Sequence, residues 1–174
     1  MRKFEFISVN QLHKDMEEVL NNNSNNTIDV SSYGATESFK LPKRATKLSA
    51  GYDIYSPFTF TLEPGQDIKI PTGLRVFMES GEALLIYPRS GLGFKYYERL
   101  ANLVGVIDGD YNQSENEGHI FVKIRNDGDK PMTVKVGDAF CQAIFTPFLL
   151  VDGDDFNTGE ERNGGFGSTT NAEG

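Results

Sequence analysis

A short segment of this sequence combines a carboxylate and an aromatic ring at the end of an apolar run. Gly105–Tyr111 reads Gly-Val-Ile-Asp-Gly-Asp-Tyr, so Asp108 follows the run and Tyr111 stands three residues later. Asp-Gly after apolar residues is typical of a strand that enters a tight turn, because glycine tolerates positive φ. Burial can tune the acidity of such a carboxyl group, and the ring can form a flat wall against a ligand. A plain solvated turn is the alternative.

A second segment, Pro88–Lys95, carries groups that suit an anion. It reads Pro-Arg-Ser-Gly-Leu-Gly-Phe-Lys after an apolar run. Arg89 offers a bidentate guanidinium fork, Ser90 a hydroxyl donor, and Gly91 a main chain that a phosphate can approach closely. Taken alone, the segment leaves phosphate binding and an ordinary polar turn open.

Short strands separated by turns are expected to position these segments. The expected strands are 52–56, 58–62, 68–70, 74–78, 83–87, 120–124, 132–136 and 140–145. Proline and glycine residues separate them, which favours an all-β class. Residues 94–103 lack turn residues and predict a short helix with Tyr96, Tyr97 and Leu100 on one side. The pattern predicts one jelly-roll-like β-barrel domain.

The two ends of the chain differ from this β-rich body. Residues 1–37 are interpreted as an N-terminal extension, residues 38–151 as the β-domain, and residues 152–174 as a tail. The tail is acidic and then Gly-rich, so it is expected to be mobile until a ligand or neighbour orders it.

The extension is expected to hold a strand over 4–9 and then a helix with Asn10 as its N-cap. The apolar residues at helical spacing are Leu12, Met16, Val19 and Leu20. An Asn-rich tract over 21–26 is expected to be a flexible linker. The extension could dock on the body or serve as an arm, and the sequence leaves both open.

Composition narrows the classes of function. The 174 residues fit one domain, and the net charge of −8 argues against binding to duplex nucleic acid but leaves a nucleotide possible. No apolar run is long enough to span a bilayer, and no basic-then-apolar leader opens the chain, so we expect neither membrane insertion nor export. The single cysteine, Cys141, is expected to be a buried thiol in a cytoplasmic protein. His13 and His119 have no ligand-like spacing, so no protein zinc site is indicated.

Five segments, in this order, resemble the five motifs of the trimeric dUTPase family. They are Ala50–Ser56, Pro88–Gly93, Gly105–Tyr111, Gly137–Gln142 and Gly164–Thr169. One such motif alone is weak, whereas five in order are highly specific. The resemblance covers roughly residues 38–170. It implies a homotrimeric dUTP diphosphatase of the β-clip, dUTPase type that uses Mg²⁺, releases dUMP and pyrophosphate, and shares each active site between subunits. Such an enzyme keeps uracil out of DNA and supplies dUMP for thymidylate synthesis.

The resemblance also implies roles for single residues. Asp108 would be the base that activates water for attack on the α-phosphorus. Tyr111 would pack against the sugar and exclude a ribose 2′-hydroxyl. Asp53 would contact Mg²⁺ through water, while substrate phosphates hold most of the ion. For Asp108, a structural capping carboxylate is the alternative.

Substrate contacts follow from the same resemblance. Arg89, Ser90 and Gly91 would hold the phosphate chain, helped by Gln142. The uracil would be read by backbone groups of the hairpin at Gly105 and Val106, with Asn102 on the strand that enters it. In the tail, Arg162 would clamp phosphate, Phe166 would stack on the base, and Gly167, Ser168 and Thr169 would complete a lid.

Three departures from the family pattern stand out. Ala139 replaces a residue that is often basic, and the spacing between Arg162 and Gly-Gly-Phe-Gly is one residue shorter than usual. Residues 112–117 lengthen the turn after Tyr111 and form either a solvated loop or a partner-binding surface. Two rival functions stay open: a dCTP deaminase of the same fold, and a binding protein that contacts a partner through the N-terminal arm or this insert.

Overall fold

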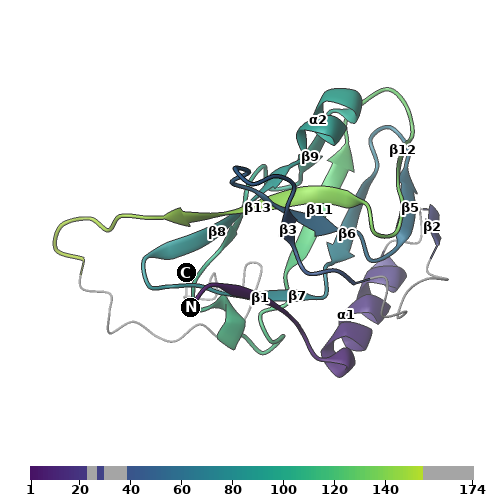
Figure 1. The fold of residues 1–174 in the computed structure, drawn as a ribbon. Coiled ribbons are helices and arrows are strands. Elements are labelled where there is room, and N and C mark those ends of the chain that lie inside the picture. The colour runs from purple at the N-terminus through teal and green to yellow at the C-terminus, as the bar shows by residue number, and fades with distance from the viewer. Residues whose placement is uncertain (23–26, 30–38, 155–174) are drawn as a thin grey trace, which may run out of the picture.

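The structure is a computed structural model that describes residues 1–22, 27–29 and 39–154. Strands dominate these residues, with a longer helix near the N-terminus and a short one in the middle of the chain (Figure 1). In chain order the elements are β1 (Lys3–Phe6), α1 (Val9–Asn22), β2 (Thr27–Asp29), β3 (Lys43–Arg44), β4 (Tyr52–Tyr55), β5 (Thr59–Leu62), β6 (Asp67–Pro71), β7 (Leu74–Phe77), β8 (Glu82–Pro88), α2 (Ser90–Tyr96), β9 (Glu98–Leu100), β10 (Gly105–Ile107), the 3₁₀ helix η2 (Tyr111–Gln113), β11 (Phe121–Asn126), β12 (Met132–Val134) and β13 (Ala139–Pro147).

The strands form four sheets within the described residues. The largest has the order β10-β8-β13-β4-β3, and the others are β6-β11-β9, β12-β5-β2 and β1-β7. The all-β class is confirmed, and the arrangement is consistent with a jelly-roll-like fold. The sheets do not close into one continuous barrel, which corrects the predicted barrel in that respect.

Strand alternation builds the core. In β5 the buried residues Phe60 and Leu62 alternate with the less buried Thr59 and Thr61, because successive side chains of a strand face opposite sides. Phe58, Phe60 and Phe140 are fully buried, and each contributes about 1.5–3 kcal/mol by leaving water.

All eight strands expected from alternation are present to within a few residues. The short strands β2, β3 and β9 carry too little pattern to be predicted.

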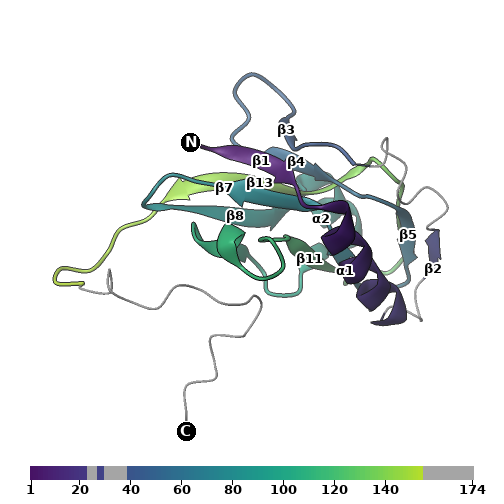
Figure 2. The ribbon, with the colours of Figure 1, turned by 90° about the horizontal axis from the view of Figure 1, so that it is seen from below.

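The N-terminal arm, residues 1–22, docks on the body (Figures 1 and 2). Its strand β1 pairs antiparallel with β7, and α1 packs against β6. The predicted N-cap is wrong: Asn10 lies inside the helix, and the Ser8 hydroxyl oxygen accepts the backbone N–H of Gln11 at 3.2 Å. Serine fills this position well because its short side chain can reach back to the first helical turn.

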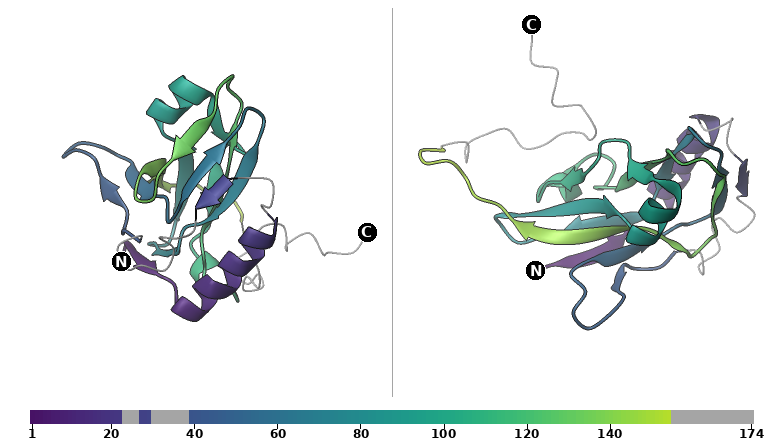
Figure 3. Two further views of the ribbon diagram at one scale, coloured as in Figure 1. Left: turned by 90° about the vertical axis from the view of Figure 1, so that its right-hand side faces the viewer. Right: turned by 90° about the horizontal axis from the view of Figure 1, so that it is seen from above.

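The helix predicted over 94–103 begins earlier and ends earlier. It is α2, which contains Ser90 and Gly91 and ends where Tyr97 takes a left-handed conformation with φ of 51°. Residues 98–100 form β9, which pairs with β11. Asn102 lies in the turn before β10 and not on a strand. α1 and α2 lie on opposite sides of the β-body (Figures 1 and 3).

Residues 148–154 run away from the β-body (Figures 1 and 2). Phe148, Leu149 and Val151 are exposed there. Within the described part of the chain, no helix is long and apolar enough to cross a membrane.

Candidate active site

One cavity, named the main cavity, is lined by residues of β9, β10 and β11 and has a volume of about 400 Å³. Five residues that the sequence indicated as a catalytic and base-reading group line it together: Asn102, Gly105, Val106, Asp108 and Tyr111. Its apolar wall is made by Ile86, Leu100, Ile107, Phe121 and Val122. An apolar cavity with a few convergent polar groups is the usual form of a small-molecule site.

Pairing between strands sets the position of Asp108. β10 pairs antiparallel with β8, with Ile107 opposite Leu84, and Asp108 is the next residue after the strand ends. The carboxylate is half-buried at the cavity wall. The backbone carbonyl of Asp108 accepts the N–H of Tyr111 at 3.2 Å, so the turn brings both side chains to the same cavity.

Gly105 is required by close packing between these strands. A Cβ at Gly105 would lie 3.1 Å from the Cβ of Ile86, a separation that only a shift of the neighbouring strand could relieve. The glycine therefore lets β10 approach β8 closely. Val106, the next residue, is 57% exposed and projects from the edge strand of the sheet.

The Tyr111 ring is buried and its hydroxyl is bonded. The hydroxyl donates to the backbone carbonyl of His119 at 2.9 Å, and the amide of Asn116 donates to the same hydroxyl at 3.1 Å. The sequence predicted that the Tyr111 ring forms a wall against a ligand. It did not predict the hydrogen-bond partners of the hydroxyl.

A second cavity of about 260 Å³, the arginine cavity, lies beside α2. It is lined by Arg89, Gly91, Leu92, Thr133, Val134, Asp138 and Ala139. Arg89 forms an ion pair with Asp53, with Nε 3.0 Å from Oδ1, and donates from Nη1 to the Ala139 carbonyl at 3.3 Å. The guanidinium is thereby oriented, and its remaining N–H groups can meet an anion.

Gln142 belongs to this same group. It lies opposite Asp53 in the β13–β4 pairing and opposite Tyr87 in the β13–β8 pairing. Its amide donates to the Pro88 carbonyl at 3.0 Å. The first, second and fourth motifs therefore meet at one place within the chain. Ser90 starts α2 and is exposed.

Asp108 of the main cavity and Arg89 of the arginine cavity are well separated along β8 within one chain. Asp108 follows Ile107, which is opposite Leu84 near the start of β8, whereas Arg89 follows the end of β8. Leu84 and Arg89 are five steps apart along the chain, and at about 3.3 Å per step this amounts to roughly 17 Å of backbone. Asp108 and Arg89 of one chain therefore belong to opposite ends of the same strand.

Sequence reasoning missed one buried acid, Glu98. Glu98 on β9 is buried, and neither carboxyl oxygen has a hydrogen-bond partner within the described residues. Burial raises its pKa to about 8. Burial, and then the nearby Glu98 and Asp53, also raise the pKa of the Cys141 thiol well above its ordinary value. The buried thiol was predicted, but the alternation of Glu-Arg-Leu gave no sign that the glutamate faces inward.

A metal cage made by the protein alone does not fit the described residues. They contain no cluster of three or more His, Cys, Asp or Glu side chains that could hold an ion. Asp53 offers one carboxylate beside an anion-binding arginine. That donor set suits Mg²⁺ bound mainly by phosphate oxygens and water.

The tail residues Arg162, Phe166, Gly167, Ser168 and Thr169 lie outside the described residues. The fold and the two cavities define a class all the same. This is a jelly-roll-like β-protein with a carboxylate at the wall of an apolar cavity and an arginine, paired with an aspartate, beside a second cavity.

Comparison with known proteins identifies the family. The family model for dUTPase matches residues 37–170. The chain is 48% identical over 130 residues to deoxyuridine 5'-triphosphate nucleotidohydrolase of Lactococcus lactis subsp. lactis (strain IL1403), with 74% of this chain and 87% of that protein covered. It is 42% identical over 137 residues to the protein of the same name from Actinobacillus pleuropneumoniae serotype 5b (strain L20), with 74% and 86% covered.

A solved structure gives the same answer. The dUTPase from Streptococcus mutans superposes with a TM-score of 0.63 at 35% identity, and the match covers 86% of this chain and 98% of that one. The chain belongs to the dUTPase family.

Proposed function

We propose that this chain hydrolyses dUTP to dUMP and pyrophosphate, with Asp108 as the general base. Membership of the dUTPase family supports the reaction. The observation that carries the assignment of the base is the position of Asp108, half-buried in the wall of an apolar cavity and one turn from Tyr111. The proposed setting is the cytoplasm, where the reaction limits uracil in DNA and supplies dUMP for thymidylate synthesis.

The proposed reaction is an in-line attack by water on the α-phosphorus. Asp108 accepts a proton from the water as the new P–O bond forms. The bond between the α-phosphorus and the oxygen that bridges to the β-phosphorus breaks, and pyrophosphate leaves with that oxygen. A positioned general base of this kind contributes about 10²–10⁴-fold to the rate.

The main cavity is proposed to hold the uracil and the deoxyribose. β10 is the outermost strand of its sheet, so the backbone groups of this strand that point away from β8 can pair with a base. Paired N–H and C=O groups match a uracil edge, whereas cytosine would leave buried polar groups without partners. Asn102 lines the same cavity, and Tyr111 would occupy the space that a ribose 2′-hydroxyl needs.

The arginine cavity is proposed to hold the phosphate chain through Arg89, Ser90 and Gly91, with Gln142 beside them. Mg²⁺ is the proposed cofactor, and when bound it would neutralise phosphate charge. Asp53 would orient the water molecules of that ion and keep Arg89 in place through the ion pair at 3.0 Å.

A complete site is proposed to need more than one subunit of a homotrimer. The separation of roughly 17 Å along β8 supports this, because one nucleotide would take its base from one chain and its phosphate contacts from another. The tail would then close a neighbour's site through Arg162, Phe166, Gly167, Ser168 and Thr169.

The direct test measures pyrophosphate release from dUTP, dCTP and UTP in parallel with Mg²⁺ present. The proposal expects rapid release from dUTP and at least about 10²-fold lower kcat/KM for the other two. Ammonia release from dCTP would instead support the deaminase of the same fold. Binding of dUTP without any turnover would support the binding-protein alternative.

A further inference from the structure

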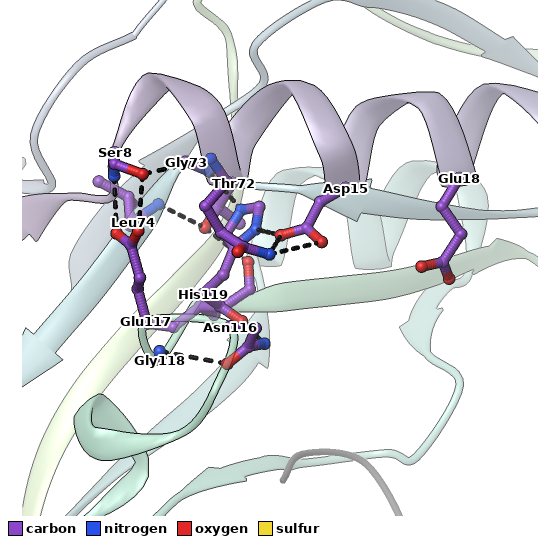
Figure 4. Close-up of polar contacts among 12 residues, drawn as sticks. Ser8, Asp15, Glu18, Thr72, Gly73, Leu74, Asn116, Glu117, Gly118 and His119 are labelled. Atoms are coloured by element: carbon purple, nitrogen blue, oxygen red, sulfur yellow. Dashed lines mark hydrogen bonds and ion pairs between the residues drawn. The ribbon is translucent and has the colours of Figure 1, made fainter.

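The N-terminal arm is joined by two carboxylates to the loop that follows η2 (Figure 4). Asp15 on α1 reaches the ring of His119, and Glu117 reaches Ser8 just before α1. The arm precedes the part of the chain that matches the dUTPase family. The arm and the loop, two features that the five motifs do not explain, therefore bind each other.

The ring of His119 is fully buried and both nitrogens are engaged. Nε2 accepts the backbone N–H of Gly73 at 2.9 Å, and Nδ1 lies 2.6 Å from Oδ2 of Asp15. A ring nitrogen that accepts a hydrogen bond carries no proton, so Nδ1 carries the proton and donates it to Asp15. Asp15 therefore fixes the tautomer and the orientation of the ring.

Asp15 is itself held as a carboxylate. Burial acts to raise its pKa, but hydrogen bonds from His119 and from the Gln11 amide outweigh burial and lower the pKa below its ordinary value. Both Asp15 oxygens lie 3.0 Å from Nε2 of Gln11. The carboxylate is buried between the arm and the body, so it cannot exchange its partners for water freely.

His119 connects this pair to two walls of the main cavity. Its backbone carbonyl accepts the Tyr111 hydroxyl at 2.9 Å. Its ring packs against the ring of Phe121, with 4.4 Å between centroids. Tyr111 and Phe121 both line the main cavity. A movement of His119 would therefore be passed directly to the surface that faces the ligand.

Glu117 fastens the same loop at the start of α1. Its two oxygens accept the backbone N–H of Ser8 at 2.8 Å and the Ser8 hydroxyl at 2.6 Å. Glu117 has φ of 60°, a left-handed conformation that costs energy for a residue other than glycine. The contacts with Ser8 help to hold this conformation, and Asn116, next to it, contacts the Tyr111 hydroxyl.

We propose that Asp15 is a positioning residue for the main cavity: through His119 it holds Tyr111 and so sets the preference for dUTP over UTP. The proposal rests on the role of Tyr111 in the proposed function. Exclusion of a single hydroxyl group requires a wall placed to within a fraction of an ångström. A ring whose hydroxyl is tied to a fixed carbonyl cannot tilt away to admit the larger sugar.

The main experiment compares Asp15→Ala with Glu18→Ala in the full-length chain. Glu18 is a matched control because it lies on the same helix, is exposed, and forms a surface ion pair with Lys69 at 3.3 Å. The ratio of kcat/KM for dUTP to that for UTP should fall about 5–10-fold in Asp15→Ala, the effect of one orphaned buried hydrogen bond. The ratio should not change in Glu18→Ala. Asp15→Asn should restore most of it, because the amide oxygen can still accept the Nδ1 proton.

Tyr111→Phe tests the link from the other end and does not depend on whether Asp15→Ala folds. It keeps the ring and removes the tether, so the ratio should fall to the same extent. In the double variant Asp15→Ala/Tyr111→Phe the ratio should be the same as in Tyr111→Phe alone, because the hydrogen bond that links Tyr111 to His119 is already absent. In the ligand-free protein, the NMR signals of the Tyr111 ring should shift in Asp15→Ala and stay in place in Glu18→Ala.

Three results would overturn the proposal while leaving the proposed function intact. They are a wild-type ratio in Tyr111→Phe, an equal loss for dUTP and UTP in Asp15→Ala, and an effect in Glu18→Ala as large as that in Asp15→Ala. A wild-type chain that turns over dUTP and UTP equally would instead refute the role of Tyr111 in the proposed function.

Discussion

Asp108 in the main cavity and Arg89 in the arginine cavity lie at opposite ends of β8, and their surroundings are held in different ways. The main cavity is set into the core: Tyr111 is buried, its hydroxyl is bonded, and the arm supports His119 behind it. The arginine cavity lies beside α2, a helix with no buried residue, and Glu98 on β9, which follows α2, is a buried acid without a described partner. The main cavity is therefore set into the core, whereas the arginine cavity lies at the surface. This difference supports the proposal that the site is assembled between subunits.

The largest effect is expected from the base in the main cavity. Asp108→Asn should lower kcat at least about 10²-fold while dUTP still binds, because the amide keeps the shape but cannot accept a proton from water. Asp110→Asn, an exposed neighbour in the same turn, is the control and should keep nearly full activity. Steady-state kinetics and binding to the inactive variant measure both quantities. A variant that retains more than about a tenth of kcat would remove Asp108 from the role of base.

A loss of binding is expected from the arginine cavity. Arg89→Ala should raise KM for dUTP about 10–100-fold, because charge-assisted hydrogen bonds to phosphate are lost. Arg89→Lys should recover the charge but not the bidentate geometry. Arg99→Ala removes an arginine that pairs with Asp127 at the surface and should leave KM unchanged. A normal KM in Arg89→Ala would place the phosphate chain elsewhere.

A loss of selectivity is expected from the wall of the main cavity. Tyr111→Ala should reduce the preference for dUTP over UTP by about 10-fold or more, since a 2′-hydroxyl gains room and water. Parallel measurement of kcat/KM for the two nucleotides gives the ratio. Equal proportional losses for both would make Tyr111 a structural residue only.

The smallest effect concerns the contribution of Glu98 to the free energy of unfolding. The pKa of Glu98 rises from 4.5 to about 8 on folding because of burial. Between these two values the unfolded chain releases the proton more readily than the folded one, so the free energy of unfolding falls as pH rises from about 4.5 to about 8.

Glu98→Leu removes the buried carboxyl group and, with it, this pH dependence. It should raise the free energy of unfolding by about 1–3 kcal/mol at pH 8 and by less at pH 5. Urea denaturation at both pH values measures the difference. A variant with the same pH dependence as wild type would show that Glu98 is solvated in the protein.

Local patterns in the sequence predicted the longer strands and part of the candidate site. Alternation of buried and exposed residues gave the longer strands, and the Asp-Gly turn after an apolar run placed Asp108 and Tyr111 at one site. Arg89, Asp53 and Gln142 were each indicated by the resemblance, whereas their meeting follows from the sheet pairing that the structure shows.

Contacts between distant segments were not predictable. Asp15 and His119 are 104 residues apart, and His119 carried no recognisable spacing. Asn10 and Ser8 both suit an N-cap, so the start of α1 was misplaced. Glu98 lies in a strand that is too short for alternation to reveal its inward face. In each case the deciding interaction is tertiary, and local sequence does not encode the partner.

The central claim is that the two halves of one working site come from different chains. The most direct measurement refolds Asp108→Asn chains with Arg89→Ala chains at equal amounts, verifies mixed trimers by native mass spectrometry, and assays dUTP hydrolysis below KM. Each variant alone supplies a site with one defective half. In mixed trimers, Asp108 of one chain can meet Arg89 of another, so activity should return to about a quarter of wild type by random assortment. Verified mixed trimers that stay as inactive as the two parents would contradict the shared site.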